Sequence, residues 1–326
     1  MNVINVVVWG LGPHAIKNIL PALTMCPGVC LYGICSRNAD IVSRFTARYE
    51  CKGWVDSGPM LEDPKVDVVY LSTPIGLHAS QGRSVLLADK HLWCEKPLAE
   101  NLAQASDLVH LSRERRISLA EGFMYLYHPQ FLQLRGILDS GRLGHLQHVT
   151  VRFGIPALDS PGFRNHPALG GGAFLDVGSH PISAIVSLLP EHNPEVLLSA
   201  TFVAPGSPVD TKGQAILRCS GSGNPVDVTL EWGINCSYRN EIDLWGSKQS
   251  VTSEYFFSKP SDYVPKFRFL DLNGNESFEY GRAANHFVAM LSAFRGFVAN
   301  PDAAEAERIA IIRRAELIDK IQRRKI

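Results

Sequence analysis

The feature that most constrains the fold is the loop Gly10-Leu11-Gly12-Pro13-His14-Ala15, which directly follows the apolar run Val3–Val8. A helical pattern continues from the loop to Met25. The first glycine permits a tight turn, the second lets the backbone approach a pyrophosphate, and the small alanine lets the helix pack close to the strand. This strand–loop–helix context predicts a dinucleotide-binding βα unit.

Strand-like and helical segments then alternate up to about residue 122. Strands are predicted at 29–34, 66–72, 92–95 and 117–122, and helices at 39–49, 79–89 and 102–115. Strict alternation implies a doubly wound parallel sheet with right-handed crossovers. We therefore assign residues 1–122 to an N-terminal Rossmann domain.

After this point the order of elements changes. Strands are predicted at 145–153, 196–203, 215–219, 226–232, 238–245 and 267–272, with helices at 129–140, 173–189, 283–299 and 303–324. Strands that follow strands, separated by turn-rich pieces, favour an antiparallel sheet. Residues 123–326 are therefore assigned to a second α/β domain, and we allow for its last two helices packing back on the first domain.

Composition narrows the class of protein. Lys+Arg and Asp+Glu both number 32, which argues against a nucleic-acid or anionic-membrane binder. The seven cysteines form no Cys-x-x-Cys pair, so free thiols in a reducing compartment are favoured over a zinc site. We expect a cytoplasmic protein with no metal. The basic residues Arg313-Arg314 and Arg323-Arg324-Lys325 alternate with acids and predict a solvated helix face.

The segment Cys35-Ser36-Arg37-Asn38, at the end of the second strand, bears on which dinucleotide binds. An NAD-selective site usually has an acid here to hold the ribose 2′-hydroxyl, and this chain has none before Asp40. A hydroxyl and a guanidinium suit a 2′-phosphate instead. NADP is therefore favoured and NAD stays open, since Arg37 could instead stack on the adenine or face solvent.

Two further strand ends carry candidate residues. Thr73-Pro74 ends the third clear strand and His78 follows at the start of a helix, where a histidine taken alone is more often a helix-capping or structural residue than a catalytic one. Glu95-Lys96-Pro97 ends the next strand. A lysine at the carboxyl end of a buried strand lies in the cofactor crevice and suits proton transfer to a hydroxyl or carbonyl oxygen.

The stretch from Gly170 to His180 is the informative part of the second domain. Three glycines precede a helical pattern that places Asp176 and His180 four residues apart on one face. A carboxylate in that position can orient the imidazole for proton exchange. A purely structural histidine is the alternative.

In this order the motifs resemble those of the Gfo/Idh/MocA family, named for glucose–fructose oxidoreductase, inositol dehydrogenase and rhizopine catabolism. The resemblance covers residues 3 to about 190. Its motifs are the glycine loop, Glu95-Lys96-Pro97-Leu98, Glu121-Gly122-Phe123-Met124-Tyr125, His128-Pro129 and the Gly170–His180 stretch.

The resemblance implies a Rossmann domain and a second domain with a large, mostly antiparallel sheet whose open face forms a homodimer or homotetramer. It places catalytic roles on Lys96, Asp176 and His180, and substrate contacts on these three with Tyr125 and Arg164. Together with the strand-end arguments, the predicted cofactor-binding residues are Gly10, Gly12, Pro13, His14, Ala15, Ser36, Arg37, Thr73, Pro74, His78, Glu95, Lys96 and Pro97.

Two departures leave the substrate subclass open. The Glu-x-Phe-Met-Tyr and His-Pro pattern is similar to dihydrodiol and xylose dehydrogenases and nucleotide-sugar 3-ketoreductases, which often have Tyr in place of His180. Relatives with histidine there tend to have an acid three residues later, where this chain has Ser183. The proton donor is therefore either Lys96 or His180.

These observations predict an NAD(P)-dependent oxidoreductase, with NADP favoured. It would transfer a hydride between nicotinamide C4 and a carbinol or ketone carbon of a sugar-like substrate, including a nucleotide-linked keto sugar. The alternatives are an NAD-dependent polyol or aldose dehydrogenase and a non-catalytic dinucleotide-binding sensor.

Overall fold

The computed structural model describes residues 3–324 and contains two compact units. The first comprises the chain up to Gly122 together with Phe287–Ile312, and the second comprises Phe123–His286 with the chain from Arg313 onward. Two separate stretches of chain therefore build each unit.

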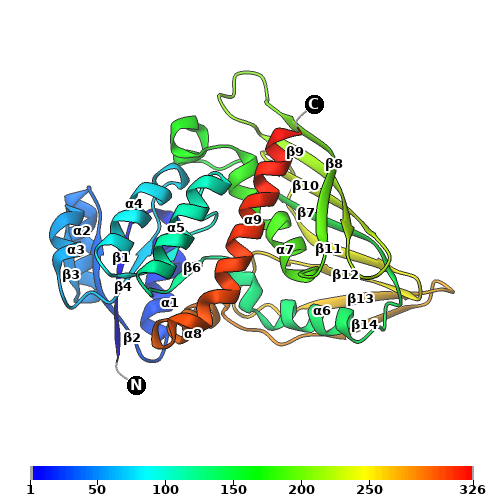
Figure 1. Cartoon of the computed structure of the whole chain (residues 1–326), viewed down its shortest axis with the longest axis horizontal. Coiled ribbons are helices and arrows are strands. Elements are labelled where there is room, and N and C mark those ends of the chain that lie inside the picture. The colour runs from blue at the N-terminus through cyan, green and yellow to red at the C-terminus, as the bar shows by residue number, and fades with distance from the viewer. Residues whose placement is uncertain (1–2, 325–326) are drawn as a thin grey trace. The chain divides into compact units, whose positions relative to one another are not determined.

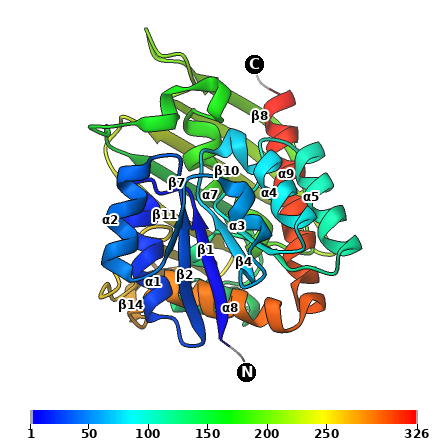
Figure 2. The same cartoon turned by 90° about the vertical axis from the view of Figure 1, so that its left-hand side faces the viewer.

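The first unit is built on a parallel six-stranded sheet with the order β3-β2-β1-β4-β5-β6. All of its neighbouring strands are parallel, and Figure 2 shows β2, β1 and β4 side by side between helices. This is the doubly wound order, so the predicted Rossmann fold is confirmed. The strands are β1 (Ile4–Trp9), β2 (Val29–Cys35), β3 (Lys52–Trp54), β4 (Val68–Leu71), β5 (His91–Cys94) and β6 (Leu119–Glu121).

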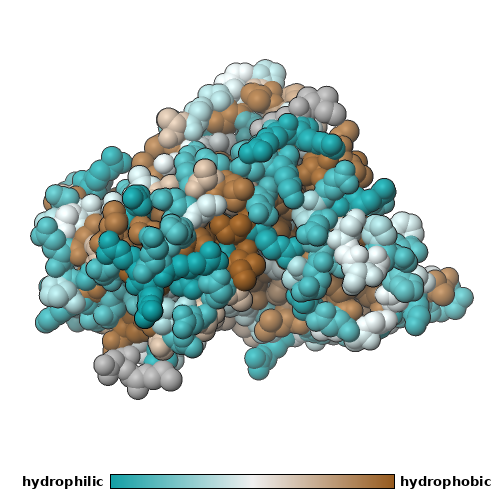
Figure 3. All heavy atoms as spheres, in the orientation of Figure 1, coloured by the Kyte–Doolittle hydropathy of each residue, from teal (hydrophilic) through white to brown (hydrophobic). Residues whose placement is uncertain are grey.

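The helices of this unit follow the strands in turn. They are α1 (Leu20–Met25), preceded by a π-helical turn at Ala15–Ile19, α2 (Ala39–Tyr49), α3 (Ser57–Glu62), α4 (Ile75–Leu87) and α5 (Leu102–Glu114). Hydrophilic side chains gather over α4 and α5 on the face seen in Figure 3. Arg83 on α4 pairs with Asp107 on α5 at 3.4 Å. These helices therefore present one solvated face and bury the other on the sheet.

Some element boundaries differ from the sequence predictions. Helix α4 begins at Ile75 rather than at residue 79, with Pro74 at its N-cap position. The prediction also missed β3 and α3. Strand β3 has three residues at the sheet edge, too few to show a period-2 pattern.

Two C-terminal helices, α8 (His286–Ala299) and α9 (Glu305–Arg323), contribute to the first unit. The ring of Phe294 packs on buried Trp93 at 5.6 Å between centroids. The buried Arg308 guanidinium donates to Ser112 Oγ at 3.1 Å and to the Ile117 carbonyl at 2.8 Å. These contacts hold α8 and the start of α9 on the Rossmann sheet and its helix α5.

The second unit is built on an eight-stranded sheet with the order β14-β13-β12-β11-β7-β10-β9-β8. Only β7 and β10 pair in parallel; the other neighbours are antiparallel, which confirms the mostly antiparallel sheet. The strands are β7 (Leu146–Ile155), β8 (Asn193–Phe202), β9 (Lys212–Ser220), β10 (Val226–Ile234), β11 (Arg239–Gly246), β12 (Gln249–Glu254), β13 (Lys266–Asp271) and β14 (Glu276–Tyr280). Strands β12 and β14 were not predicted, because both are short and rich in Ser, Thr and Glu.

The sheet of the second unit has one covered and one open face. Along β10, Val226, Val228, Leu230 and Trp232 are buried, whereas the residues between them are half-exposed. Helices α6 (Pro129–Asp139) and α7 (Ser179–Leu188) lie on the same side of this sheet in Figure 1. The predicted helix at 173–189 is a π-helical turn, Phe174–Gly178, followed by α7.

The basic C-terminal residues do not all lie on a solvated face, and the prediction was wrong for two of them. Arg314 is only 2% exposed, and its guanidinium lies over the Phe123 ring at 5.2 Å. Arg313 donates to the carbonyls of Pro190 and His192. Arg323 is exposed as expected, and Lys325 lies outside the described residues.

Between residues 3 and 324, every helix is too short or too polar to cross a lipid bilayer.

Candidate active site

The glycine loop has the geometry that a dinucleotide needs. Gly10 has a φ of +103°, and a Cβ there would lie 2.6 Å from the carbonyl carbon and oxygen of Ser72. A Cβ at Gly12 would meet no heavy atom within 4 Å. The loop therefore packs tightly against the end of β4 and leaves open space beside its second glycine. These features fit a bound pyrophosphate at the start of the helical segment.

The end of β2 presents donors and no acid. Ser36 is half-buried, and its Oγ accepts a hydrogen bond from the Asn38 amide at 3.3 Å. Asn38 in turn caps α2 by accepting from the Ile41 amide at 3.0 Å. Arg37 is exposed, and no carboxylate in residues 3–324 pairs with it. Its guanidinium is therefore accessible to an anion.

At the end of β5, a buried carboxylate precedes the candidate proton donor. Glu95 Oε1 accepts from the Tyr70 hydroxyl at 2.7 Å and lies 3.0 Å from Nε2 of His14. Lys96 follows, half-buried, and the Lys96–Pro97 peptide is cis. The predicted residues His14, Glu95, Lys96 and Pro97 are thus brought together.

The charge of Glu95 follows from these contacts. Burial raises the pKa of Glu95, but the His14 ring, the Tyr70 hydroxyl and the Lys96 ammonium outweigh it and hold the pKa at about 2. Burial and the adjacent carboxylate raise the pKa of Tyr70 well above its usual value, so its hydroxyl stays a donor. Glu95 is therefore an ionised carboxylate at neutral pH.

The turn after Lys96 is anchored on both sides. The Leu98 amide donates to the buried Glu121 carboxylate at 2.7 Å. The two ring nitrogens of buried His78 lie 2.8 Å from the carbonyl oxygens of Pro97 and Thr73. His78 was predicted to bind the cofactor, and the structure places its ring against backbone instead of at the surface.

Sequence reasoning gave no site role to three residues of this network, namely Tyr70, Gln81 and Glu121, and Glu121 entered only as part of a family motif. Gln81 accepts from Thr73 Oγ1 at 2.6 Å. Tyr70 and Glu121 each place a polar group in or at the end of an otherwise apolar strand. A polar group in an apolar strand was therefore the sequence signal that could have identified Tyr70 and Glu121.

In the second unit, Arg164 and Asp176 form an ion pair. Arg164 Nε donates to the Asp176 carboxylate at 2.5 Å, and Asp176 is buried on the π-helical turn. Asp210, which was not predicted, accepts from the Phe174 amide at 2.8 Å and so holds the start of that turn. Two of the predicted substrate residues are therefore in direct contact.

His180 lies among aromatic rings. Its ring centroid is 4.7 Å from that of Phe153, 5.4 Å from Phe257 and 6.4 Å from Tyr125. The buried Tyr125 hydroxyl donates to Ser183 Oγ at 2.9 Å. Ser183, the departure noted in the sequence, is therefore the acceptor for the predicted substrate residue Tyr125.

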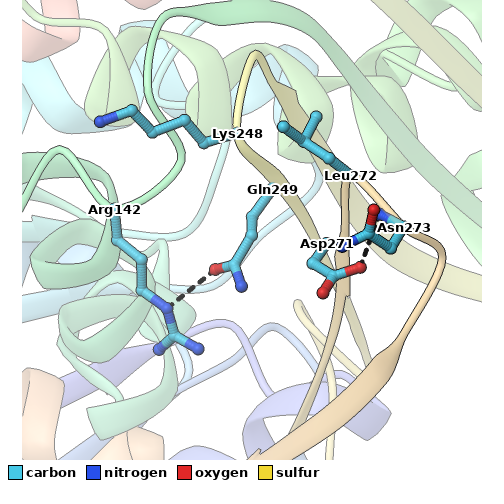
Figure 4. A pocket seen from close by; sticks show the side chains of 6 residues that line it. All are labelled: Arg142, Lys248, Gln249, Asp271, Leu272 and Asn273. Carbon is cyan, nitrogen blue, oxygen red and sulfur yellow. Dashed lines mark hydrogen bonds between the residues drawn. The ribbon is translucent and has the colours of Figure 1, made fainter.

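A separate hollow of about 440 Å³ lies beside β12 and β13, lined by Arg142, Lys248, Gln249, Asp271, Leu272 and Asn273 (Figure 4). Arg142 already donates to Gln249 at 3.0 Å, pairs with Glu279 and stacks on Phe269. The Asp271 carboxylate accepts from the Asn273 amide at 2.8 Å. None of the predicted site residues lines this hollow, so it is not the candidate active site.

Comparison with known proteins identifies the family. Residues 4–123 match the model described as "Oxidoreductase family, NAD-binding Rossmann fold", and residues 131–252 match the "GFO/IDH/MocA C-terminal domain". The dTDP-3,4-didehydro-2,6-dideoxy-alpha-D-glucose 3-reductase of Saccharopolyspora spinosa is 30% identical over 96% of this chain and 95% of its own. The chain belongs to the Gfo/Idh/MocA family.

Solved structures of family members agree with this assignment. KijD10, a 3-ketoreductase from Actinomadura kijaniata in complex with NADP and TDP-benzene, has a TM-score of 0.92 and 30% identity, covering 99% of this chain and 98% of that one. The aldose-aldose oxidoreductase of Caulobacter crescentus has a TM-score of 0.87 at 21% identity, which shows the shared fold.

The comparisons confirm the main predictions from sequence. The resemblance, the two-sheet fold and the class of NAD(P)-dependent oxidoreductase are all confirmed. The individual roles of the site residues stay predictions.

The ionised Glu95 makes stability depend on pH. Its folded pKa is lowered from 4.5 to about 2, so its contribution is complete above pH 4.5 and is lost as pH falls through 2. We expect the loss of this contribution to lower the free energy of unfolding of the wild type by about 2 kcal/mol between pH 6 and pH 3. Urea unfolding of Glu95→Gln at both pH values measures the same difference. The variant's free energy of unfolding should fall by about 2 kcal/mol less than that of the wild type.

Glu114→Gln, an exposed carboxylate change on α5, is the matched control and should follow the wild-type pH dependence. If Glu95→Gln also follows it, the carboxylate is not held ionised by its neighbours.

Proposed function

We propose that this chain is an NADPH-dependent ketoreductase of a nucleotide-linked keto sugar. The observation that carries the proposal is end-to-end similarity to 3-reductases of dTDP-linked sugars, combined with the anchored Glu95-Lys96-Pro97 turn at the end of β5. KijD10 binds NADP and TDP-benzene, which supports this cofactor and the class of substrate.

The residues of the first unit would bind the cofactor and hold a proton donor. NADPH, when bound, supplies a hydride from nicotinamide C4. The glycine loop would hold its pyrophosphate, and Ser36 with Arg37 its 2′-phosphate. Lys96 would donate a proton to the substrate oxygen as the carbonyl is reduced. Ionised Glu95 would keep a negative charge beside that ammonium and hold the nicotinamide ribose.

The second unit would supply substrate contacts. We propose His180 as an assisting proton relay and Arg164, Asp176 and Tyr125 as substrate residues. Arg164 and Asp176 present paired charges, so a substrate hydroxyl can donate to the carboxylate or accept from the guanidinium. The aromatic rings around His180 would exclude water and position the imidazole.

Replacing Lys96 with Met removes the proposed proton donor and keeps a side chain of similar length. We expect kcat for a dTDP-linked 3-keto sugar to fall by about 10²- to 10⁴-fold, while the Kd for NADPH changes little. Steady-state kinetics and NADPH fluorescence titration measure the two quantities. Exposed Lys65→Met is the control and should keep wild-type kinetics.

Near-normal turnover in Lys96→Met would overturn this role. A loss confined to His180→Phe would assign proton donation to His180. Wild-type NADPH binding without hydride transfer to nucleotide-linked keto sugars, free ketoses or aldoses would favour the sensor alternative.

The proposed role of Arg37 separates NADPH from NADH. A charge-assisted hydrogen bond contributes about 1.5–3 kcal/mol, so Arg37→Ala should raise KM for NADPH by about 10- to 100-fold. KM for NADH should change little, because NADH has no 2′-phosphate. Exposed Arg48→Ala, on the helix that follows, is the control. Tighter wild-type binding of NADH would instead favour the NAD-dependent polyol or aldose dehydrogenase.

We further propose that the open sheet face of the second unit forms a homodimer or homotetramer. This face carries the cross-strand ion pairs Arg218–Asp227 and Arg152 with Glu231 and Glu241, and also Trp245, which is 58% exposed. A large exposed indole beside ordered polar pairs is typical of interface composition. We also propose a cytoplasmic location, which suits seven cysteines that are all free thiols.

Trp245→Glu should weaken self-association by at least tenfold, because it replaces a large exposed aromatic side chain of the proposed contact with a carboxylate. Sedimentation velocity over a concentration series measures the effect. Leu132→Glu is the control, because Leu132 lies on α6 and is 60% exposed. If wild type is monomeric, or if both variants associate alike, this surface is not the interface.

A further inference from the structure

His78 occupies an unusual position between two loops of the first unit. It lies in the first turn of α4 and is 1% exposed. Its Nδ1 lies 2.8 Å from the carbonyl oxygen of Pro97, and its Nε2 lies 2.8 Å from that of Thr73. One imidazole therefore contacts the segments that follow β5 and β4, two neighbouring parallel strands.

Both partners of this ring are carbonyl oxygens, which only accept hydrogen bonds. A neutral imidazole has one N–H and so can donate to only one of them. The other nitrogen would then direct its lone pair at an oxygen 2.8 Å away, which is repulsive. Only the imidazolium form, with an N–H on each nitrogen, satisfies both carbonyls.

The groups around His78 have opposing effects on the pKa of its ring. Burial lowers the pKa of His78, while its two carbonyl partners and the Glu95 carboxylate favour the charged ring and the Lys96 ammonium disfavours it. Because the net effect lowers the pKa of His78, its ring is largely neutral at pH 7. The ring gains its second N–H at a pH below the range in which a histidine usually titrates. The double contact is therefore completed by protonation.

The two carbonyls belong to segments with proposed functions. Pro97 directly follows Lys96, so its carbonyl fixes the turn that carries the proton donor. Thr73 precedes Pro74 at the N-cap of α4, and its hydroxyl donates to Gln81. Carboxyl ends of adjacent strands are where a dinucleotide lies in this fold.

We propose that His78 is a positioning residue that ties the Lys96 turn to the loop after β4, and that protonation of its ring tightens this link. The inference rests on the proposed function, because it takes Lys96 as the proton donor. His78 acts through the backbone and touches neither cofactor nor substrate.

The test compares substitutions at two histidines of the same unit, buried His78 and half-buried His91. His78→Phe keeps a ring without donors, and His78→Gln keeps one donor group. His91→Phe is the matched control, since His91 begins β5 at the opposite end of the strand and its Nδ1 accepts from Ser118. NADPH-dependent kinetics and thermal unfolding are measured for all three and for the wild type.

We expect His78→Phe to lower kcat by about tenfold or more and to raise KM for NADPH, with His78→Gln between it and wild type. His91→Phe should lower the melting temperature and keep kcat and KM. The wild-type pH profile of kcat/KM should contain a transition below pH 6.5 that is missing in His78→Gln. Equal kinetics for the His78 and His91 variants, or identical pH profiles, would overturn the proposal.

A second measurement uses the unmodified chain and needs no activity. In protein labelled with ¹⁵N-histidine, NMR should show one protonated ring nitrogen of His78 at pH 8. It should show two protonated ring nitrogens at the lowest pH at which the protein remains folded. A ring that stays neutral throughout that range would reject the protonation-dependent link. If the NMR result is as expected but wild type reduces no carbonyl substrate, the proposed function fails and the structural link stands.

Discussion

The buried Glu95 carboxylate is the interaction on which the rest of the first unit depends. A buried carboxylate at the end of a strand is unfavourable unless donors and positive charge surround it. Tyr70 on the next strand, His14 on the glycine loop and the adjacent Lys96 meet that requirement. The same contacts connect the glycine loop to the turn that carries Lys96, so the predicted cofactor loop and the predicted proton donor share one electrostatic centre.

Hydrogen bonds of the surrounding backbone follow from this centre. Because the peptide groups after β5 cannot continue the sheet ladder, they need other partners. The Glu121 carboxylate accepts from Leu98, and His78 contacts the Pro97 carbonyl. Each partner comes from a different strand or helix, which explains how the backbone of a short turn between β5 and α5 is fixed around Lys96.

Long periodic segments were predictable, and short or exceptional ones were not. Helices α2 and α5 and the buried run of β4 were placed to within a few residues, because their hydrophobic periods extend over many positions. Strand β3 was missed since an edge strand of three residues carries no period. The buried Arg314 was misplaced because charge alternation along a helix does not reveal which side packs against an aromatic ring.

The sequence by itself determined the fold class and the class of oxidoreductase, and it predicted the residues of the candidate site. Those properties reside in local patterns, such as a glycine loop after an apolar strand or Glu-Lys-Pro at a strand end. Only the tertiary structure decided the partners: Tyr70 and His14 on Glu95, Arg164 on Asp176, and His78 between two carbonyls. The partners within each set lie on different elements, and their charge and hydrogen bonding depend on distances that no local pattern specifies.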